Sequence, residues 1–315
     1  MVLCMTPEAA PKRARISSIR DGMMVKRRKI DTSPCTHTAI KPIVASPSPS
    51  SFTRRSPSSL SFFASNFITI AALGEGDFGQ VKQVQKKDSF EEFALKVSKV
   101  DRTKVKTGLN YTMDHLKEIR SHSSLASHPN LVQFHQAWKE AGHAYLLMEL
   151  CSDSLDGYWR KKNELAQEEI KSALNDMLRA LSILSSLNIV HLDIKPQNIL
   201  RNEKGVFKLA DFGTAVDLSK DSCPEEFGDG RYAAPEILNG QFTPKADLFS
   251  LAITISQVSV PASSPLTADE WSGMKEDGHL PDRVAIALPG MAAQLQSMLL
   301  PLRSRPSVED LCKEE

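Results

Sequence analysis

Three polar residues in the second half of the chain have the types and the spacing that phosphoryl transfer requires. Asp193 and Asn198 lie in the string His-Leu-Asp-Ile-Lys-Pro-Gln-Asn, and Asp211 follows Asp193 by 18 residues in Asp-Phe-Gly. A carboxylate can accept the proton of an acceptor hydroxyl, and an amide with a second carboxylate can hold Mg²⁺ beside the phosphates of ATP. The spacing therefore predicts Asp193 as the proton acceptor and Asn198 and Asp211 as magnesium ligands.

A glycine-rich string, Gly74-Glu-Gly76-Asp-Phe-Gly79-Gln-Val81, lies between two strand-like runs. Glycine lets the backbone approach phosphate oxygens closely, and amide hydrogens there can face negative charge. A dinucleotide-binding fingerprint would be followed by a helix, whereas residues 80–84 continue as a strand. The string predicts a loop that covers the phosphates of ATP, and an ordinary glycine-rich hairpin is the alternative.

Lys96 follows Gly79 by 17 residues within the apolar string Phe-Ala-Leu-Lys-Val. A lysine in such a strand is costly unless its charge is paired. Glu118, on a helix predicted over about 110–126, is the best-placed counter-ion. We therefore expect Lys96 to position phosphates with Glu118 beside it. The alternative is a surface lysine whose aliphatic stem lies along the sheet.

The elements that must position these residues change in character along the chain. Strand-like alternation dominates up to Leu150 and helical periods dominate afterwards. The expected strands cover 67–70, 80–84, 93–97, 131–138, 144–150, 198–200 and 207–209, and the later helices cover 154–162, 167–187, 245–258, 292–300 and 307–312. A small antiparallel-sheet lobe with one main helix, followed by a larger mainly helical lobe, is an α+β fold.

Composition divides the chain at about residue 65. The formal net charge is +1, but residues 1–60 contain 11 Lys or Arg against 3 Asp or Glu. This segment is rich in Ser and Pro and has no hydrophobic period, so we expect disorder. The expected organisation is a basic tail over 1–65 and a catalytic domain over 66–313, with lobes at 66–150 and 151–313.

Two basic clusters of the tail, residues 12–15 and 26–29, could be read by nuclear import receptors, and a solvated basic tail is the alternative. The five cysteines form no CxxC pair, which favours a reducing, intracellular compartment. The longest mainly apolar run, 248–260, is too short to span a bilayer and predicts a core helix. We expect a soluble nuclear or cytoplasmic protein that binds no nucleic acid.

Later motifs complete a known order. Ala234-Pro235-Glu236, Asp247 at the head of an apolar helix, and Arg305 follow the strings above. Together they resemble the protein kinase superfamily over Phe67 to about Cys312. The resemblance implies a two-lobed kinase that uses ATP and Mg²⁺, with Arg305 paired to Glu236.

The resemblance also assigns roles in the middle of the chain. It implies that backbone groups of Glu149 and Cys151 hold the adenine, with Met148 as the gatekeeper just before them. It places Lys195 in the catalytic loop beside Asp193, as in Ser/Thr kinases.

One departure points to a particular branch. Leu192 stands where most kinases have an arginine that receives an activation-loop phosphate. We therefore expect a kinase that orders its activation segment without phosphorylation. Leu192 within His-Leu-Asp-Ile-Lys-Pro, with the strings at 228–236, 136–138 and 246–251, resembles the Wee/Myt kinases that inhibit cyclin-dependent kinases. The strings at 149–155 and 269–281 look more like the Myt branch.

This resemblance implies phosphorylation of Thr and Tyr in the glycine-rich loop of a cyclin-dependent kinase, with its cyclin complex as protein substrate and this chain as a monomer. Two alternatives stay open: a general Ser/Thr kinase outside the cell cycle, and a pseudokinase scaffold. Myt kinases have a membrane-anchoring segment after the catalytic domain, and none is found up to Glu315. Gly230 also departs from the usual Ser or Pro of the branch.

Overall fold

The computed structural model describes residues 61–76, 79–99, 118–119, 121–123, 125–220 and 227–313. The basic clusters of the tail lie outside the described residues. So does most of the helix expected over 110–126. Glu118, Ile119 and residues 121–123 are described and are helical, whereas residues 125–126 are described and are not helical, so the expected end of the helix is wrong.

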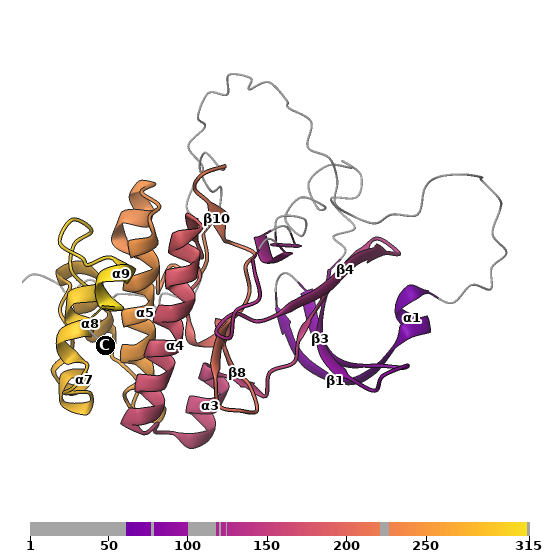
Figure 1. The fold of residues 1–315 in the computed structure, drawn as a ribbon. Coiled ribbons are helices and arrows are strands. Elements are labelled where there is room, and N and C mark those ends of the chain that lie inside the picture. The colour runs from indigo at the N-terminus through magenta and orange to yellow at the C-terminus, as the bar shows by residue number, and fades with distance from the viewer. Residues whose placement is uncertain are drawn as a thin grey trace, which may run out of the picture. The chain divides into compact units, whose positions relative to one another are not determined.

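The first part of the domain is a five-stranded antiparallel sheet in the order β1-β2-β3-β5-β4. Its strands are β1 (Phe67–Gly76), β2 (Gly79–Lys86), β3 (Glu92–Ser98), β4 (Phe134–Glu140) and β5 (His143–Glu149). Alternate residues of these strands face one side, and Phe67, Val84, Leu95 and Leu147 form a buried cluster there. Figure 1 shows this sheet in indigo to magenta.

A short helix, α1 (Phe62–Asn66), precedes the sheet. The carboxylate of Glu140 accepts hydrogen bonds from the amides of Phe62 and Phe63, and the two rings pack on the aromatic cluster around Trp138. We expected no regular structure up to about residue 65, and α1 corrects that expectation for its residues. The signal was missed because α1 depends on a partner more than 70 positions away.

Helices dominate after Glu149. The longest are α4 (Gln167–Ser186) and α5 (Pro244–Val258), which pack side by side (Figure 1). Helix α5 is apolar on nearly all sides and is buried accordingly, as expected for 248–260. The shorter helices are α3 (Leu155–Lys162), α6 (Ala268–Ser272), η4 (Gly273–Asp277), α7 (Asp282–Ala287), α8 (Ala292–Met298) and α9 (Val308–Leu311).

Short strands and turns of this lobe frame the polar residues. Strands β6 (Asp153–Ser154), β8 (Ile199–Arg201) and β9 (Phe207–Leu209) form one small sheet, and β7 (Ile189–Val190) pairs with β10 (Val216–Asp217). The 3₁₀ turns η2 (Pro196–Asn198) and η3 (Pro235–Asn239) complete the set.

The two-lobed α+β architecture is confirmed, with local differences. The strand expected over 131–138 is divided, because Leu131 forms a bridge with Leu209 and β4 begins only at Phe134. The elements between 268 and 287 were not expected, since five- and six-residue turns show too few periods to be recognised. Within the described residues, no helix is long and apolar enough to cross a membrane.

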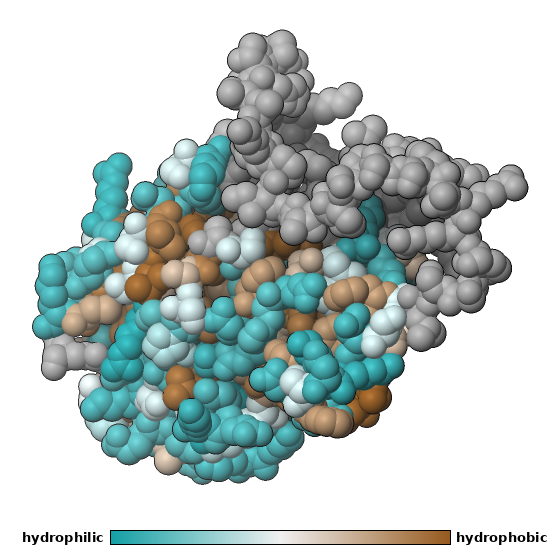
Figure 2. Space-filling view, turned by 45° about the vertical axis from the view of Figure 1, so that its right-hand side comes forward, coloured by the Kyte–Doolittle hydropathy of each residue, from teal (hydrophilic) through white to brown (hydrophobic). Residues whose placement is uncertain are grey.

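The surface agrees with a domain whose apolar side chains are mostly inside. On the face shown in Figure 2, hydrophilic residues prevail and hydrophobic ones form small patches between them.

Candidate active site

Lys96 joins groups from three separate elements. Its Nζ donates to Oε1 of Glu118 over 2.6 Å and to Oδ1 of Asp211 over 3.0 Å. The predicted pairing of Lys96 with Glu118 is confirmed. The alternative of a surface lysine is wrong, because the Lys96 side chain is only 13% exposed.

The three charges set one another's protonation. Burial alone would lower the pKa of Lys96, but the charges of Asp211 and Glu118 outweigh it and raise that pKa. Burial would raise the pKa of Asp211, yet the Lys96 ammonium holds it below its usual range. Burial raises the pKa of Glu118 in spite of Lys96. The lowered pKa of Asp211 favours its carboxylate form, which is the form that binds a metal ion.

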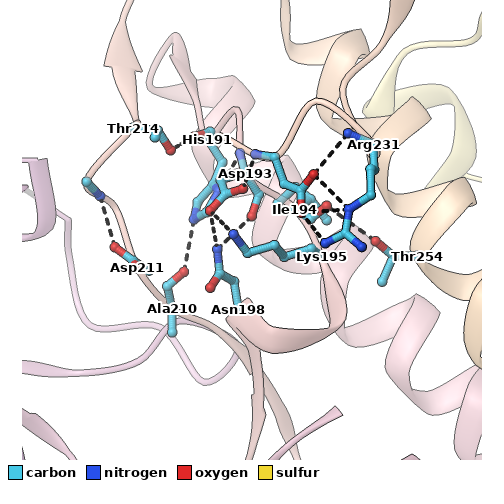
Figure 3. A network of polar contacts seen from close by, with 12 residues as sticks. His191, Asp193, Ile194, Lys195, Asn198, Ala210, Asp211, Thr214, Arg231 and Thr254 are labelled. Carbon is cyan, nitrogen blue, oxygen red and sulfur yellow. Dashed lines mark hydrogen bonds and ion pairs between the residues drawn. The ribbon is translucent and has the colours of Figure 1, made fainter. Parts of the chain in front are cut away.

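Asp193 lies at the centre of the network in Figure 3. Its Oδ2 accepts a hydrogen bond from Nδ2 of Asn198 over 2.7 Å. The same oxygen forms an ion pair with Nζ of Lys195 at 2.8 Å. Its Oδ1 accepts the backbone amide of Asp229 over 2.8 Å. Three donors from two segments therefore fix the carboxylate in one orientation.

Asp247 holds the loop that carries Asp193 through hydrogen bonds to its backbone. The two carboxylate oxygens of this buried residue accept the amides of His191 and Leu192 over 2.7 and 2.9 Å. Leu192 has a left-handed backbone, with φ 65°, which is strained for a bulky residue and needs such support. Its side chain is buried, so it offers no surface group to a phosphate.

His191 links this loop to the Asp-Phe-Gly segment. Its Nδ1 accepts the amide of Asp193 over 3.3 Å, so the proton is on Nε2, which donates to the carbonyl of Ala210 over 3.0 Å. Oγ1 of Thr214 donates to the carbonyl of His191 over 2.9 Å. Asp193 and Asp211 are thereby positioned relative to each other through hydrogen bonds between side chains and the backbone.

Phe212 extends the connection to the sheet. Its buried ring packs against His191 and His122, with centroids 5.2 and 4.8 Å apart, and His122 in turn contacts Phe134 of β4. Nε2 of His122 is 2.7 Å from the carbonyl oxygen of Val132. His122 lies one helical turn after Glu118, so this column holds the helix that carries Glu118. Sequence reasoning missed His122, since a lone histidine carries no motif.

The glycine string forms the ends of β1 and β2, with Asp77 and Phe78 outside the described residues. Gly76 is opposite Gly79, and Val81 is opposite Lys96 on β3. A Cβ at Gly79 would meet the carbonyl oxygen of Val97 at 2.3 Å, so this glycine is required for packing. Around Gly74 and Gly76 none of the described residues lies within 4 Å of a Cβ position, so the space beside these two glycines is open.

The connector between the lobes offers fewer groups to an adenine than expected. The amide of Glu149 already donates to the carbonyl of Gln133 over 2.9 Å, and its carboxylate accepts Nζ of Lys208 over 2.9 Å. The amide and carbonyl of Cys151 have no backbone partner in the described part of the chain. Met148 lies opposite Ala94 and Phe134 in the sheet.

The donor set suits Mg²⁺ only together with a nucleotide. Among the described residues, no three His, Cys, Asp or Glu side chains gather into a site that could hold a metal ion. Asp211 offers a carboxylate. The backbone carbonyl of Asn198 accepts a hydrogen bond from the amide of Ala210, the residue before Asp211, so Asn198 lies close to Asp211. Magnesium is commonly held by one or two protein groups plus substrate phosphates, so the residues fit.

The end of the activation segment is ordered by its own contacts. The Asp229 carboxylate accepts Nε and Nη2 of Arg231, and the amide of Gly228 donates to the carbonyl of Leu192 over 3.2 Å. Glu236 pairs with buried Arg305 over 2.5 and 3.2 Å, which confirms the expected pair.

This combination of sheet lobe, helical lobe and linked Lys, Asp, Asn and Asp residues defines a protein kinase. The model of the protein kinase domain family matches residues 67–278, and the chain belongs to that family. Members of this family transfer phosphate from ATP to proteins and typically use Mg²⁺.

Among its relatives is the membrane-associated tyrosine- and threonine-specific cdc2-inhibitory kinase of Drosophila melanogaster, 35% identical over 260 residues, or 80% of this chain and 47% of that protein. The corresponding kinase wee-1.3 of Caenorhabditis elegans is 34% identical over 258 residues, 80% of this chain and 37% of that protein. The Wee1-like protein kinase of Arabidopsis thaliana is 33% identical over 266 residues, 80% of this chain and 50% of that protein.

The resemblance to the Wee/Myt kinases is thus confirmed. Kinases of both branches occur at nearly the same identity, so the closer likeness to the Myt branch stays a prediction. The chain spans about half or less of the length of these relatives.

Proposed function

We propose that this kinase phosphorylates Thr and Tyr in the glycine-rich loop of a cyclin-dependent kinase and thereby inhibits entry into cell division. Relatives whose names state cdc2 inhibition align over 80% of the chain. A phosphate in the target's glycine-rich loop would place negative charge where the target binds ATP.

The contact of Lys96 with both Glu118 and Asp211 carries the catalytic part of the proposal. It joins the sheet lobe to the Asp-Phe-Gly segment with the charges in place. Lys96 then positions the phosphates under Gly74, Gly76, Gly79 and Val81. Backbone groups of Glu149 and Cys151 hold the adenine, with Cys151 offering both its amide and its carbonyl.

Asp193 orients the acceptor hydroxyl and accepts its proton as the hydroxyl oxygen attacks the terminal phosphorus of ATP. The bond between that phosphorus and the bridging oxygen breaks, and ADP leaves. Lys195 and Asn198 keep the Asp193 carboxylate in place, and the Lys195 ammonium faces the charge that develops on the transferred group. Asn198 and Asp211 are the groups that would hold Mg²⁺, whose chemistry is to neutralise phosphate charge.

The test is incubation of the full chain with a purified cyclin-dependent kinase–cyclin complex and Mg-ATP, followed by mass-spectrometric mapping of phosphosites. Phosphate on Thr and Tyr of the target's glycine-rich loop supports the proposal. Phosphate elsewhere, or only on unrelated proteins, favours the general Ser/Thr kinase.

The pseudokinase alternative is disfavoured because all four catalytic residues are present: Lys96, Asp193, Asn198 and Asp211. Lys96 contacts Asp211, and Asn198 contacts Asp193.

We further propose nuclear or cytoplasmic residence and a monomeric state. The basic clusters at 12–15 and 26–29 support nuclear import. A fluorescent fusion of residues 1–60 that spreads evenly through the cell would contradict nuclear import by these clusters.

A further inference from the structure

The turn that follows α6 lies against the end of the activation segment. Nζ of Lys275, in η4, donates to the carbonyl of Gly230 over 2.5 Å. Trp271 of α6 packs its ring edge-to-face on Tyr232, with centroids 5.4 Å apart and planes at 86°. Two contacts from one short segment thus hold residues 230–232.

This segment is itself firmly anchored. Thr267 and Glu270 form a capping box at the start of α6, and Arg283 reaches both carboxylate oxygens of Glu270 over 2.6 and 2.8 Å. Met274 is fully buried. Gly278 ends the turn with a left-handed backbone, where a Cβ would meet the carbonyl oxygen of Leu299 at 2.8 Å. The π-type turn is an uncommon element that is often found at functional sites.

The residues that it holds are continuous with those that touch Asp193. The amide of Tyr232 donates to the carbonyl of Asp229 over 3.0 Å, and the amide of Asp229 donates to Oδ1 of Asp193. A Cβ at Gly228 would lie 2.1 Å from Oδ1 of Asp193, so the backbone and the carboxylate are already in close contact. A shift of residues 230–232 would therefore move the donor that orients Asp193.

We propose that Lys275 and Trp271 are positioning residues for phosphoryl transfer, acting through residues 228–232 on the Asp193 carboxylate. The inference rests on the proposed role of Asp193 as proton acceptor and not on the identity of the protein substrate. Lys275 removes the freedom of the Gly230 backbone, which glycine would otherwise allow. Trp271 fixes Tyr232, whose hydroxyl donates to Gln257 of α5 over 2.6 Å.

The test compares Lys275→Met and Lys275→Arg in the full chain. Lys87→Met is the matched control, because Nζ of Lys87 also donates to a backbone carbonyl, that of Ala64, at 2.6 Å and far along the chain from Asp193. The readouts are the rate of phosphate transfer from labelled ATP at saturation, with autophosphorylation included, the KM for ATP and the Tm. Asp193→Asn is measured alongside.

Lys275→Met is expected to lower the rate on the order of tenfold, because small displacements of catalytic groups are costly, with unchanged KM for ATP and Tm. Lys275→Arg should restore most of it, and Trp271→Ala should lower the rate more than Trp271→Phe. A Lys275→Met rate equal to that of Lys87→Met overturns the inference, as does a loss accompanied by weaker ATP binding or lower Tm. If Asp193→Asn transfers phosphate normally, the proposed function itself fails.

Discussion

The backbone amide of Asp229 donates a hydrogen bond to Oδ1 of Asp193 over 2.8 Å, so the activation segment itself orients the carboxylate that is proposed to accept the substrate proton. Oδ2 is taken by Lys195 and Asn198 of the catalytic loop. The two oxygens of the Asp193 carboxylate thus bind two different segments of the chain. The activation segment must therefore be ordered for Asp193 to be correctly placed as the proton acceptor.

Gly228→Ala tests this close approach. The added methyl group would lie 2.1 to 2.4 Å from three side-chain atoms of Asp193, so the segment or the carboxylate must move. The transfer rate should fall on the order of a hundredfold, as expected for a catalytic group displaced by about 1 Å. Gly230→Ala is the matched control, because nothing lies within 4 Å of its Cβ position. Equal rates for the two variants in a steady-state kinase assay would contradict this account.

The catalytic assignments predict different losses at two aspartates. Asp193→Asn should lower the rate by about 10² to 10⁴, the usual contribution of a proton acceptor, and leave the affinity for Mg-ADP nearly unchanged. Asp211→Asn should abolish transfer and weaken Mg-ADP binding, and Lys96→Arg should abolish transfer because a guanidinium cannot reproduce both contacts of the ammonium. Calorimetric titration with Mg-ADP separates these effects. Normal transfer by either aspartate variant would refute the assignment.

Much of this site could be predicted because its residues carry chemistry at fixed spacings. Asp193, Asn198 and Asp211 lie within one short stretch, and Lys96 is recognisable as a charge in an apolar strand. The Glu236–Arg305 pair, 69 positions apart, was expected only through the family resemblance.

Contacts without a motif could not be predicted. Glu149 binds Lys208 across 59 positions, and Lys275 binds the Gly230 carbonyl across 45. Neither pair has a periodicity or a spacing that a single sequence reveals. The fold follows the same rule, since the long amphipathic α4 and buried α5 were predicted closely whereas η4 and α7 were missed.

Arg305→Ala should lower stability and activity together. The Arg305 side chain is 1% exposed and its removal leaves the buried Glu236 carboxylate unpaired, which costs roughly 3–5 kcal/mol of unfolding free energy. Activity should fall because Glu236 ends the activation segment. Arg179→Ala removes the half-exposed partner of Asp176 and should cost about 0–1 kcal/mol. Denaturant titration measures both, and similar losses for the two variants would contradict a structural role for the buried pair.

Activity should not depend on phosphorylation of the activation segment. Leu192 is buried and apolar, and Gly228, Asp229, Arg231 and Glu236 are held by hydrogen bonds and ion pairs with other residues of the chain. Phosphatase-treated protein should therefore keep most of its rate when assayed beside the untreated protein. A large loss on dephosphorylation, reversed by phosphate on Thr214, Ser219 or Ser222, would show that the segment is a switch.

The most direct test of the central claim is a phosphosite map of a cyclin-dependent kinase–cyclin complex after incubation with Mg-ATP and either the wild-type chain or Asp193→Asn. We predict phosphate on Thr and Tyr of the target's glycine-rich loop with the wild type, a matching loss of the target's own activity, and neither effect with Asp193→Asn. An unmodified glycine-rich loop after incubation with wild-type protein that is active on other substrates would contradict the proposed function.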